Sequence, residues 1–178
     1  MKRVLFIGLN YISGMALNTC FASAASLPIA RLFSVIRIED DVLNASSYFY
    51  REVDEIKETI EQSGKSTRSI ILLDELFKGT NTVERIAAAK AVLSYLEQQN
   101  SQIFVSTHDI ELTTLLGDKF DLFHFTESIV DSSIYFDYKI KKGISQSGNA
   151  LKIIAIHQYP EAIVQEAEEL LHTMKRNY

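Results

Sequence analysis

Two short apolar runs, each followed by polar or charged residues, constrain the fold of this 178-residue chain most strongly. The first run, Ser69–Leu73, reads SIILL and leads into Asp74-Glu75; the second, Gln102–Ser106, reads QIFVS and leads into Thr107-His108. Short continuous apolar runs are typical of strands that are buried on both faces, as in a parallel sheet. The sequence therefore predicts two buried strands that both end in residues capable of chemistry.

The first 25 residues favour a buried helix, because apolar side chains recur at spacings of three and four: Leu5, Leu9, Ile12, Ala16 and Cys20. Leu27-Pro28 ends this pattern, since the residue before a proline is pushed out of the helical region. The same stretch also resembles an export signal, with Lys2-Arg3 before an apolar segment and Ala22–Ala24 as a cleavage site. A protein exported with a cleaved N-terminus is therefore an alternative interpretation.

Further predicted elements alternate in type along the chain. In order, we expect a strand at Leu32–Ile38, an acidic loop at Glu39–Asp41, a helix capped by Asn44–Ser47 that runs to about Gln62, a turn-rich loop at Ser63–Ser69, a helix at Thr82–Gln98 and a helix from about Asp109. The expected inner face of the helix at 82–98 consists of Val83, Ile86, Ala89, Leu93 and Leu96.

Alternating strands and helices predict an α/β fold, with a mostly parallel sheet covered by helices on both faces. In such folds the chemistry lies beyond the carboxyl ends of the strands. Asp74-Glu75 and Thr107-His108 are therefore expected on one rim.

The C-terminal third has a different pattern. Asp121–Thr126 and Ser132–Ile140 are expected to be two strands at a sheet edge, followed by helices at Asn149–His157 and Pro160–Thr173. The last helix carries an apolar stripe: Ile163, Val164, Ala167, Leu170 and Leu171. We expect an α/β core over residues 1–147 and a C-terminal helical pair over residues 148–178.

Composition excludes several classes of protein. Eighteen Lys and Arg against 23 Asp and Glu give a net charge of −5, which argues against a domain that grips nucleic acid through its own charge. A single cysteine, Cys20, cannot form an internal disulfide and fits a reducing compartment. No run of 18 apolar residues is present, so no membrane-spanning helix is expected. We expect a cytoplasmic protein without membrane contact.

The paired acids after the first apolar run suit a site for a magnesium-bound nucleotide. Asp74 could hold the hydrated metal, and Glu75 could orient or deprotonate the attacking water. His108 could hydrogen-bond a terminal phosphate from the neighbouring strand end. The alternative interpretation is two solvated acids at a strand end and a histidine that caps or lies on the surface.

Two other features are weaker. Ser63–Thr67 reads SGKST, but Thr59 occupies the position of the glycine in GxxxxGK[ST], and the expected order is helix, loop, strand rather than strand, loop, helix. We interpret it as a flexible loop. His124, His157 and His172 have no partner at metal-ligand spacing, so no zinc site is expected.

Taken together, these motifs resemble the C-terminal ATPase domain of the MutS family of mismatch-repair proteins. The resemblance is carried by Leu72–Leu96, with its Walker B-like Asp74-Glu75 and the GTST-like loop Gly79–Thr82, and by Phe104–Leu112 with Thr107-His108. The segment Ser47–Glu52 is similar to the family's STF…E segment. Phe136–Gly143 resembles its paired strands, and Asn149–Ala167 its terminal helical pair.

The resemblance implies a three-layer fold of the P-loop NTPase type, similar to ABC ATPases, that binds Mg–ATP between two subunits of a homodimer or with a partner MutS-like subunit. It implies that Asp74 binds Mg²⁺, Glu75 activates water and His108 contacts the terminal phosphate. Thr80, Asn81 and Thr107 would also contact the nucleotide, and Ser47 would reach the partner's nucleotide from a helix N-terminus. Binding of mismatched DNA is implied only for domains absent from this chain.

One departure from the family pattern bears on activity. The family's GPNxxGKS/T loop precedes a helix that corresponds to Met1–Ala25, so we expect the first strand and the phosphate loop to be missing. Charge-assisted hydrogen bonds are worth roughly 1.5–3 kcal/mol each, so we expect poor ATP binding and negligible hydrolysis by this chain alone. Whether it is an enzyme therefore stays open, and the alternative is a non-catalytic dimerisation or interaction module derived from such an ATPase.

Overall fold

The computed structural model describes residues 2–36, 45–63, 67–130, 133–145 and 148–176. The acidic loop Glu39–Asp41 and the capping residue Asn44 lie outside these ranges. Contacts group the chain into two compact units, Met1–Phe120 and Asp121–Tyr178, which are treated separately below. This grouping does not test the expected division at residue 147, which stays a prediction.

The first unit is built on a parallel sheet with β2 at its centre. The strands are β1 (Arg31–Val35), β2 (Ser69–Asp74) and β3 (Ser101–Ser106), in the order β1-β2-β3. Every residue of β2 is buried, which confirms the two-sided burial predicted from its continuous apolar run. The register pairs Asp74 with Ser106, so β2 and β3 end side by side.

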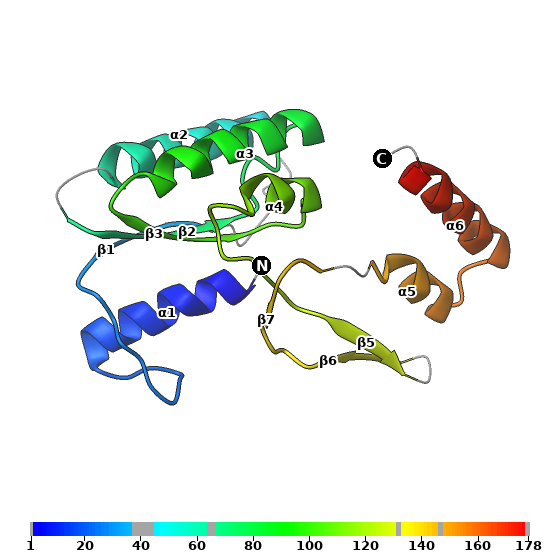
Figure 1. The fold of residues 1–178 in the computed structure, drawn as a ribbon, viewed down its shortest axis with the longest axis horizontal. Helices are drawn as coiled ribbons and strands as arrows, with labels where there is room; N and C mark the ends of the chain where they lie inside the picture. The colour runs from blue at the N-terminus through cyan, green and yellow to red at the C-terminus, as the bar shows by residue number, and fades with distance from the viewer. Residues whose placement is uncertain (1, 37–44, 64–66, 131–132, 146–147, 177–178) are drawn as a thin grey trace. The chain divides into compact units, whose positions relative to one another are not determined.

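Helices cover both faces of this sheet, as predicted. α2 (Ala45–Ser63), α3 (Thr82–Glu97) and α4 (Ile110–Leu116) lie on one face and α1 (Lys2–Leu17) lies on the other (Figure 1). Alternate residues of β2 serve the two faces: Ile71 and Leu73 pack with α3, whereas Ile70 and Leu72 pack with α1. Each fully buried side chain of this size contributes about 1.5–3 kcal/mol to folding.

The face of α1 that packs on the sheet differs from the one predicted. Val4, Gly8 and Tyr11 are buried, whereas Leu9 and Ile12 are exposed. Gly8 favours this face, because a Cβ at this position would lie 2.7 Å from Leu72 Cδ1, so the glycine lets the helix lie close to β2 without displacing the Leu72 side chain.

The end of α1 also differs from the prediction. The helix stops at Leu17, and Asn18 follows with a left-handed φ of 51°, which asparagine tolerates better than most residues. The expected helical positions from there to Ala25, including Cys20, are therefore not helical. Beyond them, the Tyr11 hydroxyl donates to the Ala30 carbonyl at 2.7 Å and ties the helix to the segment that enters β1.

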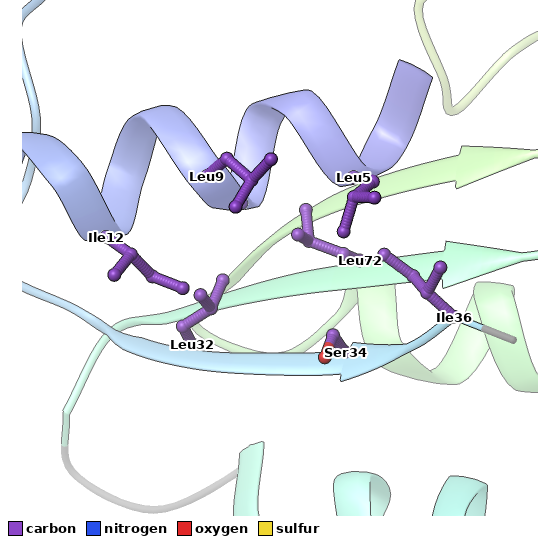
Figure 2. A pocket seen from close by; sticks show the side chains of 8 residues that line it. Leu5, Leu9, Ile12, Leu32, Ser34, Ile36 and Leu72 are labelled. Atoms are coloured by element: carbon purple, nitrogen blue, oxygen red, sulfur yellow. The ribbon is translucent and has the colours of Figure 1, made fainter. Parts of the chain in front are cut away.

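Three of the side chains expected at the buried face of α1, those of Leu5, Leu9 and Ile12, line a groove instead. Figure 2 shows this groove between α1 and the sheet, with a volume of about 180 Å³ and the labelled lining residues Leu5, Leu9, Ile12, Leu32, Ser34, Ile36 and Leu72. Its lining is almost entirely apolar and includes none of the predicted site residues.

The predicted inner face of α3 is confirmed except at its start. Ala89, Leu93 and Leu96 are buried, but Val83 is 78% exposed. In a strand–loop–helix unit the helix begins at the carboxyl edge of the sheet, so strand side chains do not cover its first turn. Val83 therefore follows the helical periodicity without reaching the core.

The second unit contains two small antiparallel sheets and two helices. β5 (Glu127–Val130) pairs with β6 (Ser133–Phe136), and β4 (Phe123–His124) pairs with β7 (Lys141–Lys142), in sheets that are separate from β1–β3. The helices are α5 (Ala150–Ile156) and α6 (Glu161–Arg176), close to the predicted ranges. No helix in the described part of the chain is long and apolar enough to cross a membrane.

The predicted strands at 121–126 and 132–140 are therefore wrong in extent and in partner. A turn after β6 explains the interruption of the second one. Tyr138 has a left-handed φ of 54°, and the Asp137 carboxylate accepts a hydrogen bond from the Lys139 backbone N–H at 3.0 Å. Such an aspartate turn offers the backbone an alternative to a strand ladder.

Candidate functional site

Asp74 and Ser106 form the floor of the candidate site, where β2 and β3 end. The Ser106 hydroxyl donates a hydrogen bond to Asp74 Oδ1, and Asp74 is buried. One residue further, the Glu75 backbone N–H donates to the Ser106 carbonyl at 3.0 Å. The hydrogen-bonded register of the two strands thus continues to the first residue of the loop and fixes the backbone of both acids.

Glu75 lies between two basic side chains. Its Oε1 is 3.2 Å from His108 Nδ1, and its Oε2 is 3.2 Å from Lys78 Nζ. Glu75 has a left-handed φ of 51°, which turns the chain sharply as it leaves β2. The predicted juxtaposition of Glu75 and His108 on one rim is confirmed; their catalytic roles stay predictions.

The surroundings of Glu75 favour its ionised form. Partial burial raises the pKa of the carboxyl, but the hydrogen bonds and charges of Lys78 and His108 outweigh burial and hold the pKa below its ordinary value. Glu75 is therefore a carboxylate at neutral pH. A carboxylate in this state can accept a proton or orient a water molecule.

The residues after β3 are arranged by a buried ion pair. Arg85 on α3 donates two hydrogen bonds to Asp109, which occupies the N-cap position of α4. The Thr107 hydroxyl accepts a hydrogen bond from the Asp109 backbone N–H at 3.0 Å. These contacts fix the turn that carries His108.

Three predicted nucleotide-binding residues have other contacts or lie outside the description. Asn81 caps α3, since its side-chain oxygen accepts from the Glu84 backbone N–H at 3.0 Å, and the Thr80 hydroxyl donates to the Glu84 carboxylate at 2.9 Å. Ser47 is in the first turn of α2, but its side chain lies outside the described part of the structure. The nucleotide contacts of these residues stay predictions.

The structure adds residues that the sequence did not single out. Lys78 contacts Glu75, Ser106 contacts Asp74, and Arg85 pairs with Asp109. Ser106 had a usable signal, because parallel strands that end together place their last residues opposite each other. Lys78 and Arg85 had none, since the first contact depends on the loop after β2 and the second on the turn between β3 and α4.

The oxygen donors of this site suit a magnesium ion. Asp74 supplies a carboxylate, and Ser106 supplies a hydroxyl hydrogen-bonded to it. Mg²⁺ is commonly held by one or two carboxylates together with water and substrate phosphates rather than by a full protein cage. The described residues contain no group of three or more His, Cys, Asp or Glu that could hold a metal by themselves.

The SGKST segment, Ser63–Thr67, does not stand where a phosphate loop would, between a strand and the helix that follows it. Of this segment the structure describes Ser63, the last residue of α2, and Thr67, two residues before β2, so the segment follows a helix and precedes a strand. This order is the one predicted, and it is the reverse of a phosphate loop.

An α/β domain with paired acids and a histidine at adjoining strand ends is the class that the fold and the site define. The family model of MutS domain V matches residues 6–175, nearly the whole chain. The chain belongs to the MutS family.

Curated relatives agree with this assignment. The DNA mismatch repair protein MutS of Bacillus cytotoxicus is 30% identical over 169 residues, and that of Pseudothermotoga lettingae is 31% identical over 154 residues. The MutS of Haloquadratum walsbyi is 29% identical over 166 residues. The alignments cover 92%, 84% and 88% of this chain, but only 19%, 19% and 18% of the relatives. The chain thus spans about a fifth of the length of the relatives it matches.

Proposed function

We propose that this chain binds Mg–ATP at the carboxyl ends of β2 and β3 and couples the nucleotide to DNA mismatch repair or a related DNA transaction. The observation that carries the proposal is the convergence of Asp74, Glu75 and His108 at two adjoining strand ends in a MutS domain V. Ligands of open α/β sheets bind at this edge.

The proposed roles follow from the chemistry of each side chain. Mg²⁺, when bound, neutralises charge on the phosphates, and Asp74 is the residue that would hold it. Glu75 orients the attacking water and accepts its proton, and His108 contacts the terminal phosphate. Thr80, Asn81 and Thr107 lie on loops that follow the same strand ends and are proposed as further nucleotide contacts.

The proposed site is shared between two subunits. Ser47 lies in the first turn of α2, and a helix N-terminus offers free N–H groups and a positive potential to a phosphate. We propose that it reaches the nucleotide held by a second copy or by another MutS-like subunit. Because this chain carries a net charge of −5, we propose that DNA is contacted through other domains of the protein rather than through this one.

The affinity for ATP is expected to be low in a protein made of residues 1–178. We propose a fold of the P-loop NTPase type, but these residues contain no GxxxxGK[ST] sequence. The backbone N–H groups and the lysine of such a loop supply several charge-assisted hydrogen bonds to phosphate, each worth roughly 1.5–3 kcal/mol. Without them, binding in the millimolar range and slow hydrolysis are expected.

One observation favours the second candidate, a non-catalytic interaction module. α6 carries an apolar stripe, and Ile163, Leu170, Leu171 and Met174 on it are exposed. Exposed apolar stripes of this kind often mark contacts between proteins. This candidate predicts association of two chains through the second unit without nucleotide chemistry at Glu75.

Titration of the ¹⁵N-labelled chain with Mg–ATP tests the proposal and detects millimolar binding. The expected result is a set of saturable amide shifts at residues 74–76 and 107–109 that requires Mg²⁺. Asp74→Asn should weaken both the Mg²⁺ requirement and the binding, whereas the exposed Asp118→Asn should bind as the wild type does. An absence of saturable shifts at these residues would refute the proposal and favour the interaction module.

A further inference from the structure

The loop from Glu75 to Thr80 has an unusual backbone. Glu75 and Phe77 both have left-handed φ values, 51° and 59°. Residues other than glycine seldom adopt this conformation, and a bulky side chain such as phenylalanine does so rarely. Such a backbone persists only where surrounding contacts fix it, so the contacts to this loop decide where the Glu75 carboxylate is held.

Helix α2 supplies the contacts to the middle of the loop. Glu52 Oε1 accepts a hydrogen bond from the Phe77 backbone N–H at 2.5 Å. The rings of Phe49 and Phe77 pack with their centroids 6.4 Å apart. Gly79 completes the contact, because a Cβ at this position would lie 3.2 Å from Phe49 Cβ.

Packing alone does not account for a glutamate at position 52. Glu52 is 2% exposed, and burying a carboxylate costs free energy unless hydrogen bonds stabilise it. A leucine would fill similar space without this cost. A glutamate does what an apolar side chain cannot, because its Oε1 accepts a short hydrogen bond from the backbone N–H of Phe77.

We propose that Glu52 is a positioning residue for Glu75. By holding the Phe77 N–H, Glu52 fixes the left-handed turn two residues after Glu75 and keeps the Glu75 carboxylate against His108 and Lys78. An effect of Glu52 on ATP hydrolysis rests on the proposed role of Glu75 as the base. Its effect on the position of the Glu75 carboxylate does not depend on that role.

The ring signals of His108 report this geometry without nucleotide. In the 178-residue chain, the Cε1–Hε1 signal of His108 is recorded at fixed pH, and Glu75→Gln provides its position when the carboxylate is lost. Glu52→Ala and Glu52→Asp, which shortens the side chain by one methylene, should move the signal towards the Glu75→Gln position. Glu52→Gln keeps an acceptor oxygen at the same reach and should stay near the wild type.

Two controls separate positioning from general destabilisation. Glu58→Gln removes an exposed carboxylate from the same helix and should leave the His108 signal unchanged. The signal of His124, whose ring contacts the Gly143 carbonyl in the other unit, should not move in any of these variants. Unfolding curves identify a variant that does not fold; if Glu52→Ala fails, Glu52→Asp decides.

The outcomes for the two proposals are distinct. A His108 signal at its wild-type position in folded Glu52→Ala or Glu52→Asp would overturn the positioning role, whatever the chain does with ATP. Where the chain hydrolyses ATP, these variants should lower kcat about tenfold or more with the affinity for Mg–ATP unchanged, since a small misplacement of a reacting group costs rate rather than binding. Wild-type chain that fails to bind Mg–ATP would overturn the proposed function and leave the His108 result to decide the role of Glu52.

Discussion

Arg85 on α3 and Asp109 at the start of α4 form a two-pronged ion pair. Arg85 Nε donates to Asp109 Oδ2 at 2.9 Å, and Arg85 Nη2 donates to Asp109 Oδ1 at 2.7 Å. Both side chains are largely buried, with 13% and 8% of their surface exposed. Because Asp109 follows His108 directly, this pair holds the turn that presents the histidine to Glu75.

Replacing Arg85 with methionine is expected to lower the free energy of unfolding by about 3–5 kcal/mol, because it leaves the Asp109 carboxylate buried without its guanidinium partner. Urea unfolding followed by circular dichroism measures the change. The matched control is Lys119→Met, since Lys119 pairs with Glu97 at 3.4 Å on the surface, and exposed pairs are worth about 0–1 kcal/mol. Equal effects of the two substitutions would show that the Arg85 pair does not hold the turn.

The same pair predicts a dependence of stability on pH. The hydrogen bonds from Arg85 lower the pKa of Asp109; burial opposes this, but the charge of Arg85 adds to the lowering, and the folded-state pKa lies below the ordinary value. A group with a lowered folded pKa stabilises the protein above its unfolded pKa, about 3.9, and loses that contribution as pH falls through the folded value. The stability advantage of wild type over Asp109→Asn should therefore be constant above about pH 5 and shrink at lower pH.

Unfolding curves of wild type and Asp109→Asn at a series of pH values check this expectation. Asparagine is similar in size to aspartate and is also common at the N-cap position that residue 109 occupies, so the substitution removes the charge with little change in shape. The exposed Asp118→Asn should follow the wild type throughout. A difference between wild type and Asp109→Asn that stays constant into strong acid would mean that the Asp109 charge does not stabilise the fold.

The placement of Glu75 and His108 on one rim could be predicted from the sequence, because buried strands that alternate with helices can form only a few sheet topologies. Two buried strands that alternate with helices must run parallel, and parallel strands bring their carboxyl ends to one edge. This reasoning placed Glu75 near His108, and the 3.2 Å contact confirms it. Periodicity in α3 likewise identified Ala89, Leu93 and Leu96 as core.

The sequence was less informative where a close approach or a turn decides the structure. In α1, several faces carry apolar residues at helical spacing, and the absence of a side chain at Gly8 favours the face that packs near Leu72. In the second unit, the aspartate turn at Asp137 ends a pattern that otherwise reads as one strand. Lys78 contacts Glu75 within a loop whose backbone is left-handed at Glu75, and residue spacing alone does not show that conformation.

Gly79→Ala is expected to destabilise the chain by about 1–3 kcal/mol. The added Cβ would lie 3.2 Å from Phe49 Cβ, which is fixed to the backbone of α2 and cannot move without the helix. The usual gain from replacing glycine, about 0.4–1 kcal/mol through the unfolded chain, is smaller than this cost. Thermal or urea unfolding measures the change.

Gly148→Ala is the matched control for Gly79→Ala. No atom lies within 4 Å of a Cβ built at Gly148, so this substitution should be neutral or slightly stabilising. If Gly79→Ala were as well tolerated as Gly148→Ala, the contact between α2 and the loop after β2 would be looser than the structure shows.

In a complemented or extended protein that binds the nucleotide, Glu75→Gln is expected to separate binding of ATP from its hydrolysis. Glutamine keeps the size of the side chain and leaves Asp74 in place for Mg²⁺, so Mg–ATP should bind with an affinity close to that of the wild type. The amide cannot accept a proton from water, and removal of a general base lowers turnover about 10²–10⁴-fold. Radiolabelled ATP under single-turnover conditions measures hydrolysis, and amide shifts at saturating Mg–ATP measure binding.

Glu111→Gln, which changes an exposed glutamate on α4, is the control and should retain both binding and hydrolysis. Turnover that is undiminished in Glu75→Gln would remove Glu75 as the base, and loss of binding instead would assign its charge to holding the metal.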